Sequence, residues 1–262
     1  MTIEKKSYIH PTAIVEDTVC IDDNVQVGPY CVIKGNVQIG KDTILKERVS
    51  IEGNTIIGEN NIIFAGAVIG SVTQDKKFSG GASYLRIGNN NKIREYVTIN
   101  PGTENGTETV IGNDNLLMAY SHVAHDCMVH NNVTLANVAT LAGHVTVEDR
   151  AIIGGLSAVH QFVRIGKLAI IGGCSKVVQD VPPFTMADGH PVKAFGINSV
   201  GLDRNDFPKE EKAELKRAYK IIFRSKLSNN NAVEKLKSEL QQYPSIQYLI
   251  LFLEASSRGV CR

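Results

Sequence analysis

Residues 111–182 read, in blocks of six, IGNDNL LMAYSH VAHDCM VHNNVT LANVAT LAGHVT VEDRAI IGGLSA VHQFVR IGKLAI IGGCSK VVQDVP. The first residue of every block is Ile, Leu or Val. A period of six matches neither the 3.6-residue period of a helix nor the two-residue period of an ordinary strand. It is typical of a hexapeptide β-solenoid, in which each unit supplies one short strand and one turn and buries its aliphatic residue by stacking on its neighbours.

The same period runs through most of the chain before this stretch. It starts at Ile9, stops after Ile69, resumes at Ile87 and stops again after Ile99. A small or β-branched residue usually comes four positions after each aliphatic one, and we expect it to face inward as well. Three units would close one triangular coil of about 18 residues. We therefore expect about nine coils, stacked at roughly 4.8 Å per strand.

Two segments rich in Gly, Ser, Thr and Asn interrupt the period, 71–86 and 100–110, and the repeat returns in phase after each. We expect them to be loops that project from the coils rather than linkers between domains. Residues 1–190 are expected to form the solenoid, and residues 191–262 a small helical domain in which apolar residues recur at helical spacing in three stretches. Between them, residues 184–202 have no regular pattern.

The composition excludes several classes of protein. A formal net charge of +1 provides no long-range field for nucleic acid or an anionic membrane, so neither is an expected partner. The N-terminus has no apolar segment of the signal-peptide type, and the most apolar run, 248–253, is too short to span a bilayer. We therefore expect a cytoplasmic protein without a membrane span. The five cysteines form no C-x-x-C pair, which favours reduced thiols.

Five of the seven histidines fall within the opening stretch. We expect His130 to be a solvated surface residue, which leaves His122, His125, His144 and His160 as candidates. Residues about 18 apart lie above one another in stacked coils. Gly143 is therefore expected above His125, and Gln161 above Gly143. Because His144 and His160 are their immediate neighbours, the spacing predicts that the imidazoles line one vertical strip of the solenoid.

This strip would suit general-base chemistry. An imidazole such as His125 titrates near neutral pH, and the adjacent Asp126 could fix its tautomer. The backbone N–H of Gly143 could stabilise an oxyanion. The chain has no G-x-S-x-G motif, no P-loop and no dinucleotide-binding fingerprint, and Cys127 occupies an inward-facing position of the repeat. A base without a nucleophile favours direct acyl transfer to a substrate hydroxyl.

Two other interpretations stay open at the level of residue spacing. Three of the histidines could hold zinc, as in the hexapeptide-repeat carbonic anhydrases. The second possibility is a non-catalytic solenoid whose histidines serve the packing of a trimer. Against zinc, the strip also carries Gln161 and lies near a loop with Lys76 and Lys77, a setting better suited to a polar, anionic substrate.

The motifs together resemble one bacterial enzyme family, the acyl-carrier-protein-dependent UDP-N-acetylglucosamine O-acyltransferases. The resemblance covers essentially the whole chain, and it is carried by Thr73-Gln74-Asp75-Lys76-Lys77, Ile93-Arg94-Glu95, Asp114-Asn115-Leu116-Leu117-Met118, His122-Val123-Ala124-His125-Asp126-Cys127, Leu141-Ala142-Gly143-His144, Ala158-Val159-His160-Gln161-Phe162, Gly172-Gly173-Cys174 and Gln179-Asp180-Val181-Pro182-Pro183. The sister family that N-acylates UDP-3-acyl-glucosamine carries a large domain before its repeat. The repeat here starts at Ile9, which favours the O-acyltransferases.

The resemblance implies a fold and a reaction. The fold is a left-handed parallel β-helix with a small C-terminal α-helical domain, assembled as a homotrimer with its active sites between subunits. The reaction moves a long 3-hydroxyacyl chain from acyl carrier protein to the glucosamine 3-hydroxyl of UDP-N-acetylglucosamine, the first step of lipid A biosynthesis. No cofactor and no metal are implied.

The resemblance also implies residue roles. His125 is the general base, Asp126 its supporting carboxylate and Gly143 the oxyanion donor. Gly173 limits the acyl length, and its lack of a side chain implies a long chain. Substrate contacts are implied for Gln74, Asp75, Lys77, His122, His144, His160, Gln161, Asn198 and Arg204. Val200 and Asn205 depart from the family pattern, in which an acidic residue and a second arginine are frequent, so uridine recognition is expected to differ in detail.

Overall fold

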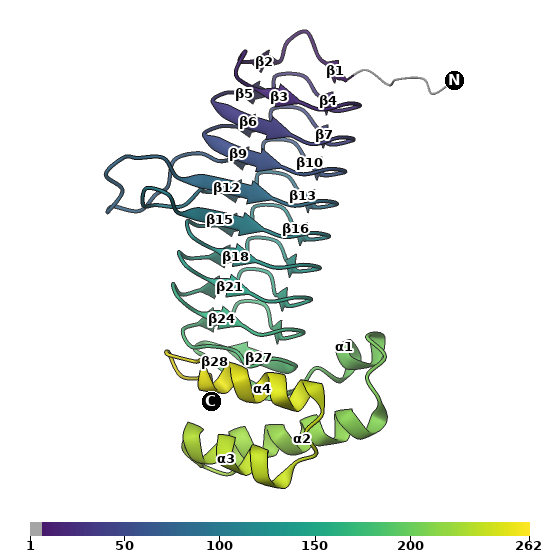
Figure 1. Ribbon diagram of the computed structural model, residues 1–262, viewed down its shortest axis with the longest axis vertical. Coiled ribbons are helices and arrows are strands. Elements are labelled where there is room, and N and C mark those ends of the chain that lie inside the picture. Colours follow the sequence, from purple (N-terminus) through teal and green to yellow (C-terminus); the bar gives the residue numbers. More distant parts are fainter. Residues whose placement is uncertain (1–6) are drawn as a thin grey trace.

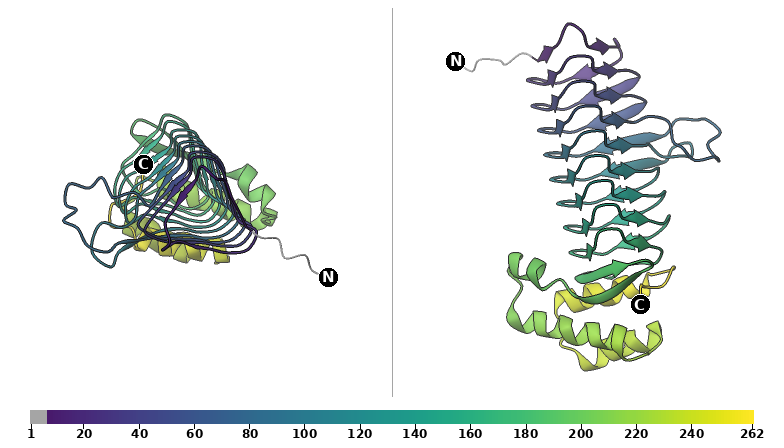
Figure 2. Two further views of the ribbon diagram at one scale, coloured as in Figure 1. Left: turned by 90° about the horizontal axis from the view of Figure 1, so that it is seen from above. Right: turned by 180° about the vertical axis from the view of Figure 1, so that it is seen from behind.

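The protein is a tall, three-sided parallel β-solenoid with four helices at its C-terminal end (Figures 1 and 2). The structure is a computed structural model and describes residues 7–262. The fold class predicted from the period of six, with a helical C-terminal part, is confirmed. Each coil contributes one short strand to each of three parallel sheets, so the solenoid is built from three flat faces joined by tight turns.

The first sheet continues past the last coil into a hairpin. Its strands, in spatial order, are β1 (Tyr8–Ile9), β4 (Gln26–Val27), β7 (Ile44–Leu45), β10 (Ile62–Ile63), β13 (Lys92–Ile93), β16 (Leu116–Leu117), β19 (Thr134–Leu135), β22 (Ile152–Ile153), β25 (Ile170–Ile171), β27 (Thr185–Gly189) and β28 (Val192–Ile197). The second sheet contains β2 (Ile14–Val15), β5 (Val32–Ile33), β8 (Ser50–Ile51), β11 (Val68–Ile69), β14 (Thr98–Ile99), β17 (His122–Val123), β20 (Thr140–Leu141), β23 (Ala158–Val159) and β26 (Lys176–Val177).

The third sheet holds the longest strands of the solenoid. It contains β3 (Cys20–Ile21), β6 (Asn36–Ile39), β9 (Asn54–Ile57), β12 (Tyr84–Ile87), β15 (Glu108–Ile111), β18 (Met128–Val129), β21 (Thr146–Val147) and β24 (Arg164–Ile165). The four-residue strands β6, β9, β12 and β15 begin two residues earlier than their neighbours, so β12 and β15 start inside the segments expected to be loops. The parts without strand are residues 71–83 and 100–107.

The aliphatic residues of the period form the core, as predicted. Val123 pairs with Leu141 across neighbouring coils, and Leu141 in turn pairs with Val159, so like side chains stack along each face. All three are 2% exposed or less. The second inward position is also buried, for example at Val145 and Ala169. Because each coil covers the apolar side chains of the next, the residues of the period are buried from Val27 onward, whereas Ile9 in the first coil is 44% exposed.

Beyond the last coil the chain is more regular than the sequence suggests. Residues 184–202 have no period of six because β27 and β28 form an antiparallel hairpin, in which β27 extends the first sheet beside β25. A short helix, α1 (Ser199–Arg204), was also not predicted. The three expected helices are α2 (Lys209–Arg224), α3 (Asn229–Glu239) and α4 (Pro244–Glu254). The proposed division at residue 190 falls in the turn of the hairpin and stays a prediction.

The helices close the C-terminal end of the solenoid (Figure 1). Tyr248 of α4 donates a hydrogen bond of 2.7 Å to Glu148, which also accepts from Arg164 at 3.1 Å. Burial, and then this hydrogen bond to the carboxylate, raises the pKa of Tyr248 well above its usual value. None of the helices within residues 7–262 combines the length and apolar character needed to span a bilayer. All five cysteines are free thiols.

Candidate active site

Three of the four predicted histidines lie on the corner where the second sheet turns into the third, and His122 lies in β17, just before this corner. Three successive turns, residues 124–127, 142–145 and 160–163, are stacked there, and we call them the histidine corner. The N–H of His144 donates to the carbonyl of His125 at 3.0 Å, and Phe162 donates to Gly143 at 3.1 Å. These bonds hold the turns one above another. The stacking predicted from the 18-residue spacing is therefore present.

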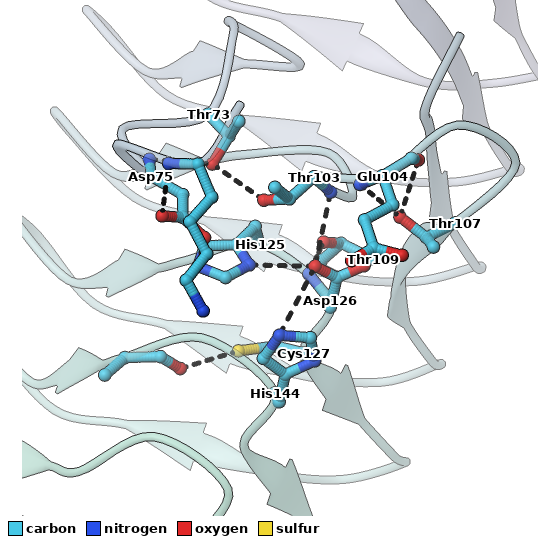
Figure 3. Close-up of polar contacts among 12 residues, drawn as sticks. Thr73, Asp75, Thr103, Glu104, Thr107, Thr109, His125, Asp126, Cys127 and His144 are labelled. Carbon is cyan, nitrogen blue, oxygen red and sulfur yellow. Dashed lines mark hydrogen bonds and ion pairs between the residues drawn. The ribbon is translucent and has the colours of Figure 1, made fainter. Parts of the chain in front are cut away.

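His125 is held by carboxylates near both of its ring nitrogens (Figure 3). Its Nδ1 lies 2.8 Å from Oδ2 of Asp126, and its Nε2 lies 3.6 Å from Oδ2 of Asp75. The side chains of His125 and Asp126 are only 12% and 9% exposed. Because the carboxylate of Asp126 is an acceptor, this contact places a proton on Nδ1 and leaves Nε2 to accept one. The ring is therefore oriented as a general base requires.

Asp75 and the polar groups around it come from the two loops that interrupt the repeat. Asp75 lies in the loop of residues 71–83, beside Gln74, Lys76 and Lys77. The loop of residues 100–107 reaches the same place from the next coil, where the N–H of Thr103 donates to Oδ2 of Asp126 at 3.2 Å. Both loops project from one corner of the solenoid (Figure 2). The site is thus built from three turns and two loops.

His144 is a second imidazole at the Asp126 carboxylate. Its Nε2 lies 3.8 Å from Oδ2 of Asp126, and its ring meets that of His125 edge-on, with centroids 5.1 Å apart. On its other face it stacks on Phe162, with ring centroids 4.5 Å apart and nearly parallel planes. Aromatic stacking of this kind fixes the orientation of an imidazole. His144 is 40% exposed, so it also remains accessible to a ligand.

Gly143 brings its backbone directly against the catalytic-base candidate. A Cβ at this position would lie 2.3 Å from Cε1 and 2.4 Å from Nε2 of His125, so only glycine leaves room for the ring. No hydrogen bond among residues 7–262 uses the amide N–H of Gly143 as donor. That N–H is therefore available to a ligand beside His125.

These groups surround a hollow of about 460 Å³. Its lining includes His122, whose Nδ1 lies 2.7 Å from Oγ1 of Thr98. Burial, and then the neighbouring His125, lowers the pKa of His122, which favours the neutral form of this imidazole. The full lining is Gln74, Asp75, Lys76, Lys77, Asn100, His122, Ala124, His125, Ala142, Gly143 and Gln161.

Two family models match the chain. One, described as Udp N-acetylglucosamine O-acyltransferase, Domain 2, matches residues 180–261, and the bacterial transferase hexapeptide model matches residues 108–143. An acyl-[acyl-carrier-protein]–UDP-N-acetylglucosamine O-acyltransferase from Thermodesulfovibrio yellowstonii is 54% identical over 97% of this chain and 99% of its own length. A relative of the same name from Aliivibrio salmonicida is 50% identical over 99% and 100%.

The chain belongs to the UDP-N-acetylglucosamine O-acyltransferase family. Solved structures of this family agree with that assignment. A UDP-N-acetylglucosamine acyltransferase from Bacteroides fragilis has 39% sequence identity and a TM-score of 0.95, with 97% of this chain and 100% of that chain covered. The enzyme from Francisella novicida gives a TM-score of 0.94 at 39% identity, over 97% and 94%. The resemblance inferred from the motifs is confirmed.

Membership of the O-acyltransferase family bears on the zinc alternative. That interpretation needed three histidines around one ion. The structure instead brings together two imidazoles and one carboxylate, with ligand atoms of His125, Asp126 and His144 all within 4.8 Å of one another. This set could hold an ion, but the relatives and structures named above are acyltransferases rather than carbonic anhydrases. The acyltransferase interpretation is therefore the one developed below.

Six residues given roles by the family resemblance do not line the hollow of their own chain: Asp126 and His144, which lie beside His125, and four others. His160 lies on the histidine corner but faces Arg258, whose Nη2 is 3.4 Å from its Nδ1. Gly173 lies in a turn between the first and second sheets, on a different corner. Asn198 is buried and caps α1: it accepts from the N–H of Gly201 and donates to the carbonyl of Leu168, both at 2.8 Å. Arg204 is exposed at the end of α1.

Sequence reasoning missed several residues of the site. Thr103 and Asn100 had no assigned role, and Lys76, which lines the hollow, was considered only as part of the charge of its loop. Both Asn100 and Thr103 lie in a loop without periodicity, so nothing in their spacing places them beside His125. One signal did exist: the loop of residues 100–107 leaves the repeat at the same corner as the loop that carries Asp75.

Proposed function

We propose that the chain transfers a 3-hydroxyacyl group from acyl carrier protein to the 3-hydroxyl of the glucosamine in UDP-N-acetylglucosamine. The relatives that match over nearly their full length are named acyl-[acyl-carrier-protein]–UDP-N-acetylglucosamine O-acyltransferases, which supports the donor and the acceptor classes. The observation that carries the mechanism is His125, oriented by Asp126 and lying against the Gly143 amide in an open hollow.

The steps follow from this geometry. Nε2 of His125 takes the proton of the sugar 3-hydroxyl as its oxygen attacks the thioester carbonyl carbon. The carbonyl oxygen becomes an oxyanion, to which the N–H of Gly143 donates a hydrogen bond. The tetrahedral intermediate then collapses with cleavage of the carbon–sulfur bond. The imidazolium returns its proton to the departing thiolate, and Asp126 stabilises the charged ring between the two transfers.

The polar groups of the first loop suit the sugar nucleotide. Asp75 lies next to Nε2 of His125, where it can accept a hydrogen bond from a sugar hydroxyl. Lys76 and Lys77 are exposed at the mouth of the hollow and supply positive charge for a diphosphate. Gln161 and Gln74 offer amide groups in the same hollow.

We further propose that the working form is a homotrimer with the site between subunits. The corner between the first and second sheets carries an apolar ridge, which we define as Tyr96, Tyr120, Val138 and Leu156, each 40–64% exposed. Tyr96 and Tyr120 stack with ring centroids 5.1 Å apart. A continuous exposed apolar ridge on one chain supports its burial against another copy.

A neighbouring subunit would also explain the residues missing from the hollow. Gly173 lies on the same corner as the apolar ridge, so a ridge packed beside the next subunit's histidine corner would bring Gly173 toward the acyl chain. Its lack of a side chain supports a long acyl group. Arg204 could reach the nucleotide in the same way. A cytoplasmic location remains a prediction.

The test is an acyl-transfer assay with purified protein, UDP-N-acetylglucosamine and a panel of 3-hydroxyacyl carrier proteins of different chain length. We expect an acylated sugar nucleotide whose ester is on the 3-position by NMR, with activity insensitive to metal chelators. His125→Ala should lower turnover by about 10²- to 10⁴-fold, the range for loss of a general base, with little change in Tm.

His130→Ala is the matched control, because His130 follows β18 on another corner and lines no part of the hollow. Unchanged turnover in His125→Ala would remove this residue from the mechanism. Loss of activity on chelation would favour the zinc alternative, and unfolding of His125→Ala would favour a histidine that serves packing only.

A further inference from the structure

The two loops of the site are joined to each other through a pair of buried hydroxyl groups. Oγ1 of Thr73, in the loop of residues 71–83, lies 3.2 Å from Oγ1 of Thr103, in the loop of residues 100–107. Both residues are only 7% exposed. Because a buried hydroxyl without a partner is costly, each of the two constrains the position of the other. Figure 3 shows the pair directly beside His125.

Thr73 and Thr103 also form hydrogen bonds with the two aspartates that flank His125. Oγ1 of Thr73 accepts a hydrogen bond of 3.2 Å from the N–H of Asp75, whose carboxylate approaches Nε2 of the imidazole. The N–H of Thr103 donates to Oδ2 of Asp126, which binds Nδ1. The contacts therefore close a ring: His125, Asp126, Thr103, Thr73, Asp75 and back to His125.

We propose that Thr73 and Thr103 are positioning residues for the catalytic base, acting through the two carboxylates that flank it. Their mutual hydrogen bond, which we call the loop latch, ties the loops together so that Asp75 and Asp126 approach the imidazole from opposite sides. Neither threonine lines the hollow, so the latch acts without touching substrate. The catalytic part of this inference rests on the proposed function.

Other contacts between the loops do not reach the carboxylates. At the base of the loops, Asn100 donates to the carbonyl of Ser71 at 3.0 Å. Farther out, Asn105 accepts from the N–H of Ala82 at 3.0 Å. These contacts hold the loops near each other. Among the side-chain contacts between the loops in residues 7–262, the threonine pair is the one that leads to both aspartates: Thr73 accepts from the N–H of Asp75, and Thr103 donates to the carboxylate of Asp126.

The two loops need such a restraint because both contain glycines. The first loop contains Gly80 and Gly81, both at positive φ, and the second contains Gly106, also at positive φ. Glycine-rich loops have high conformational entropy, so a carboxylate carried by one is poorly fixed unless something restrains it. A displacement of a catalytic group by about 1 Å can lower the reaction rate on the order of 100-fold. A restraint close to the carboxylates therefore protects the rate.

The test compares Thr73→Val, Thr103→Val and the double variant, because valine keeps the shape and removes the hydroxyl. Each single variant should lower kcat by about tenfold, the scale of one net hydrogen bond. The double variant should fall no further than Thr73→Val, since both substitutions break the same bond. Thr73→Ser and Thr103→Ser retain the hydroxyl and should restore most of the activity. In an Asp126→Ala background, Thr103→Val should have a smaller effect than in the wild type, because only the path through Asp75 is left.

Asn105→Ala is the matched control, because it removes a contact between the same loops that does not lead to His125. It should keep wild-type kcat. Multiplicative losses in the double variant, failure of serine to rescue, or an equal loss in Asn105→Ala would each overturn the loop latch. A large fall in Tm in the valine variants would do the same, since it would indicate a general structural role.

A second readout separates the loop latch from the reaction itself. The Nδ1 proton of His125, assigned by its disappearance in His125→Ala, should be visible by NMR in the wild type and broadened by exchange in Thr103→Val. If this resonance changes but the wild type transfers no acyl group to UDP-N-acetylglucosamine, the proposed function fails and the latch stands. If the wild type is active and both kcat and the resonance are unchanged in Thr103→Val, the latch fails alone.

Discussion

Gly143→Ala offers the most direct test of how the site is packed. The new Cβ would lie 2.3 Å from Cε1 and 2.4 Å from Nε2 of His125, about 1 Å inside ordinary contact, which begins at 3.4 Å. The backbone at this position is outside the left-handed region, so alanine itself is not strained there. The ring must therefore move by about 1 Å and stretch its 2.8 Å contact with Asp126. A displacement of this size is expected to lower kcat/KM by about 100-fold, or about 2.7 kcal/mol of transition-state stabilisation.

The assay is steady-state acyl transfer together with thermal unfolding. Tm should fall by no more than a few degrees, because the clash is with one side chain at the edge of an open hollow. Gly196→Ala is the control: it lies in β28, away from the histidine corner, and its Cβ would meet its nearest atom, Cε of Met186, at an ordinary contact distance of 3.7 Å. Wild-type kcat/KM in Gly143→Ala would refute the contact between this backbone and the base, and a collapse of Tm would show that the glycine is required for folding.

Two further predictions concern titratable groups away from the catalytic base. Burial raises the pKa of Cys127 to about 12, so iodoacetamide at pH 8 should label the exposed Cys20 and spare Cys127, as read by mass spectrometry of peptides. Burial and the hydrogen bond to Glu148 raise the pKa of Tyr248 in the folded state. Tyr248 therefore contributes its full stabilisation below about pH 10, where this tyrosine begins to ionise in the unfolded chain. The contribution is lost as the pH rises further. Tyr248→Phe should therefore lose less stability than the wild type between pH 9 and 11 in urea unfolding, and equal slopes for the two proteins would contradict this.

The site was predictable where it follows the period and not where it leaves it. The stacking of His125, Gly143 and Gln161 followed from counting 18 residues, because a solenoid converts sequence distance directly into vertical distance. The distance from His125 to Asp75 could not be obtained in that way. Residues 71–83 and 100–107 carry no repeat, and their positions are set by contacts with each other, such as that between Thr73 and Thr103.

The amino-acid sequence alone determined the solenoid, since the aliphatic signal recurs in every six residues and each coil needs only its neighbours to bury it. It also determined which residue types share the histidine corner. The tertiary structure decided the rest: the carboxylates around His125, the burial of Asn198 as the cap of α1 rather than in the hollow, and the hairpin of β27 and β28. These features depend on contacts between segments that follow no common period, and such contacts are fixed only when the chain is packed.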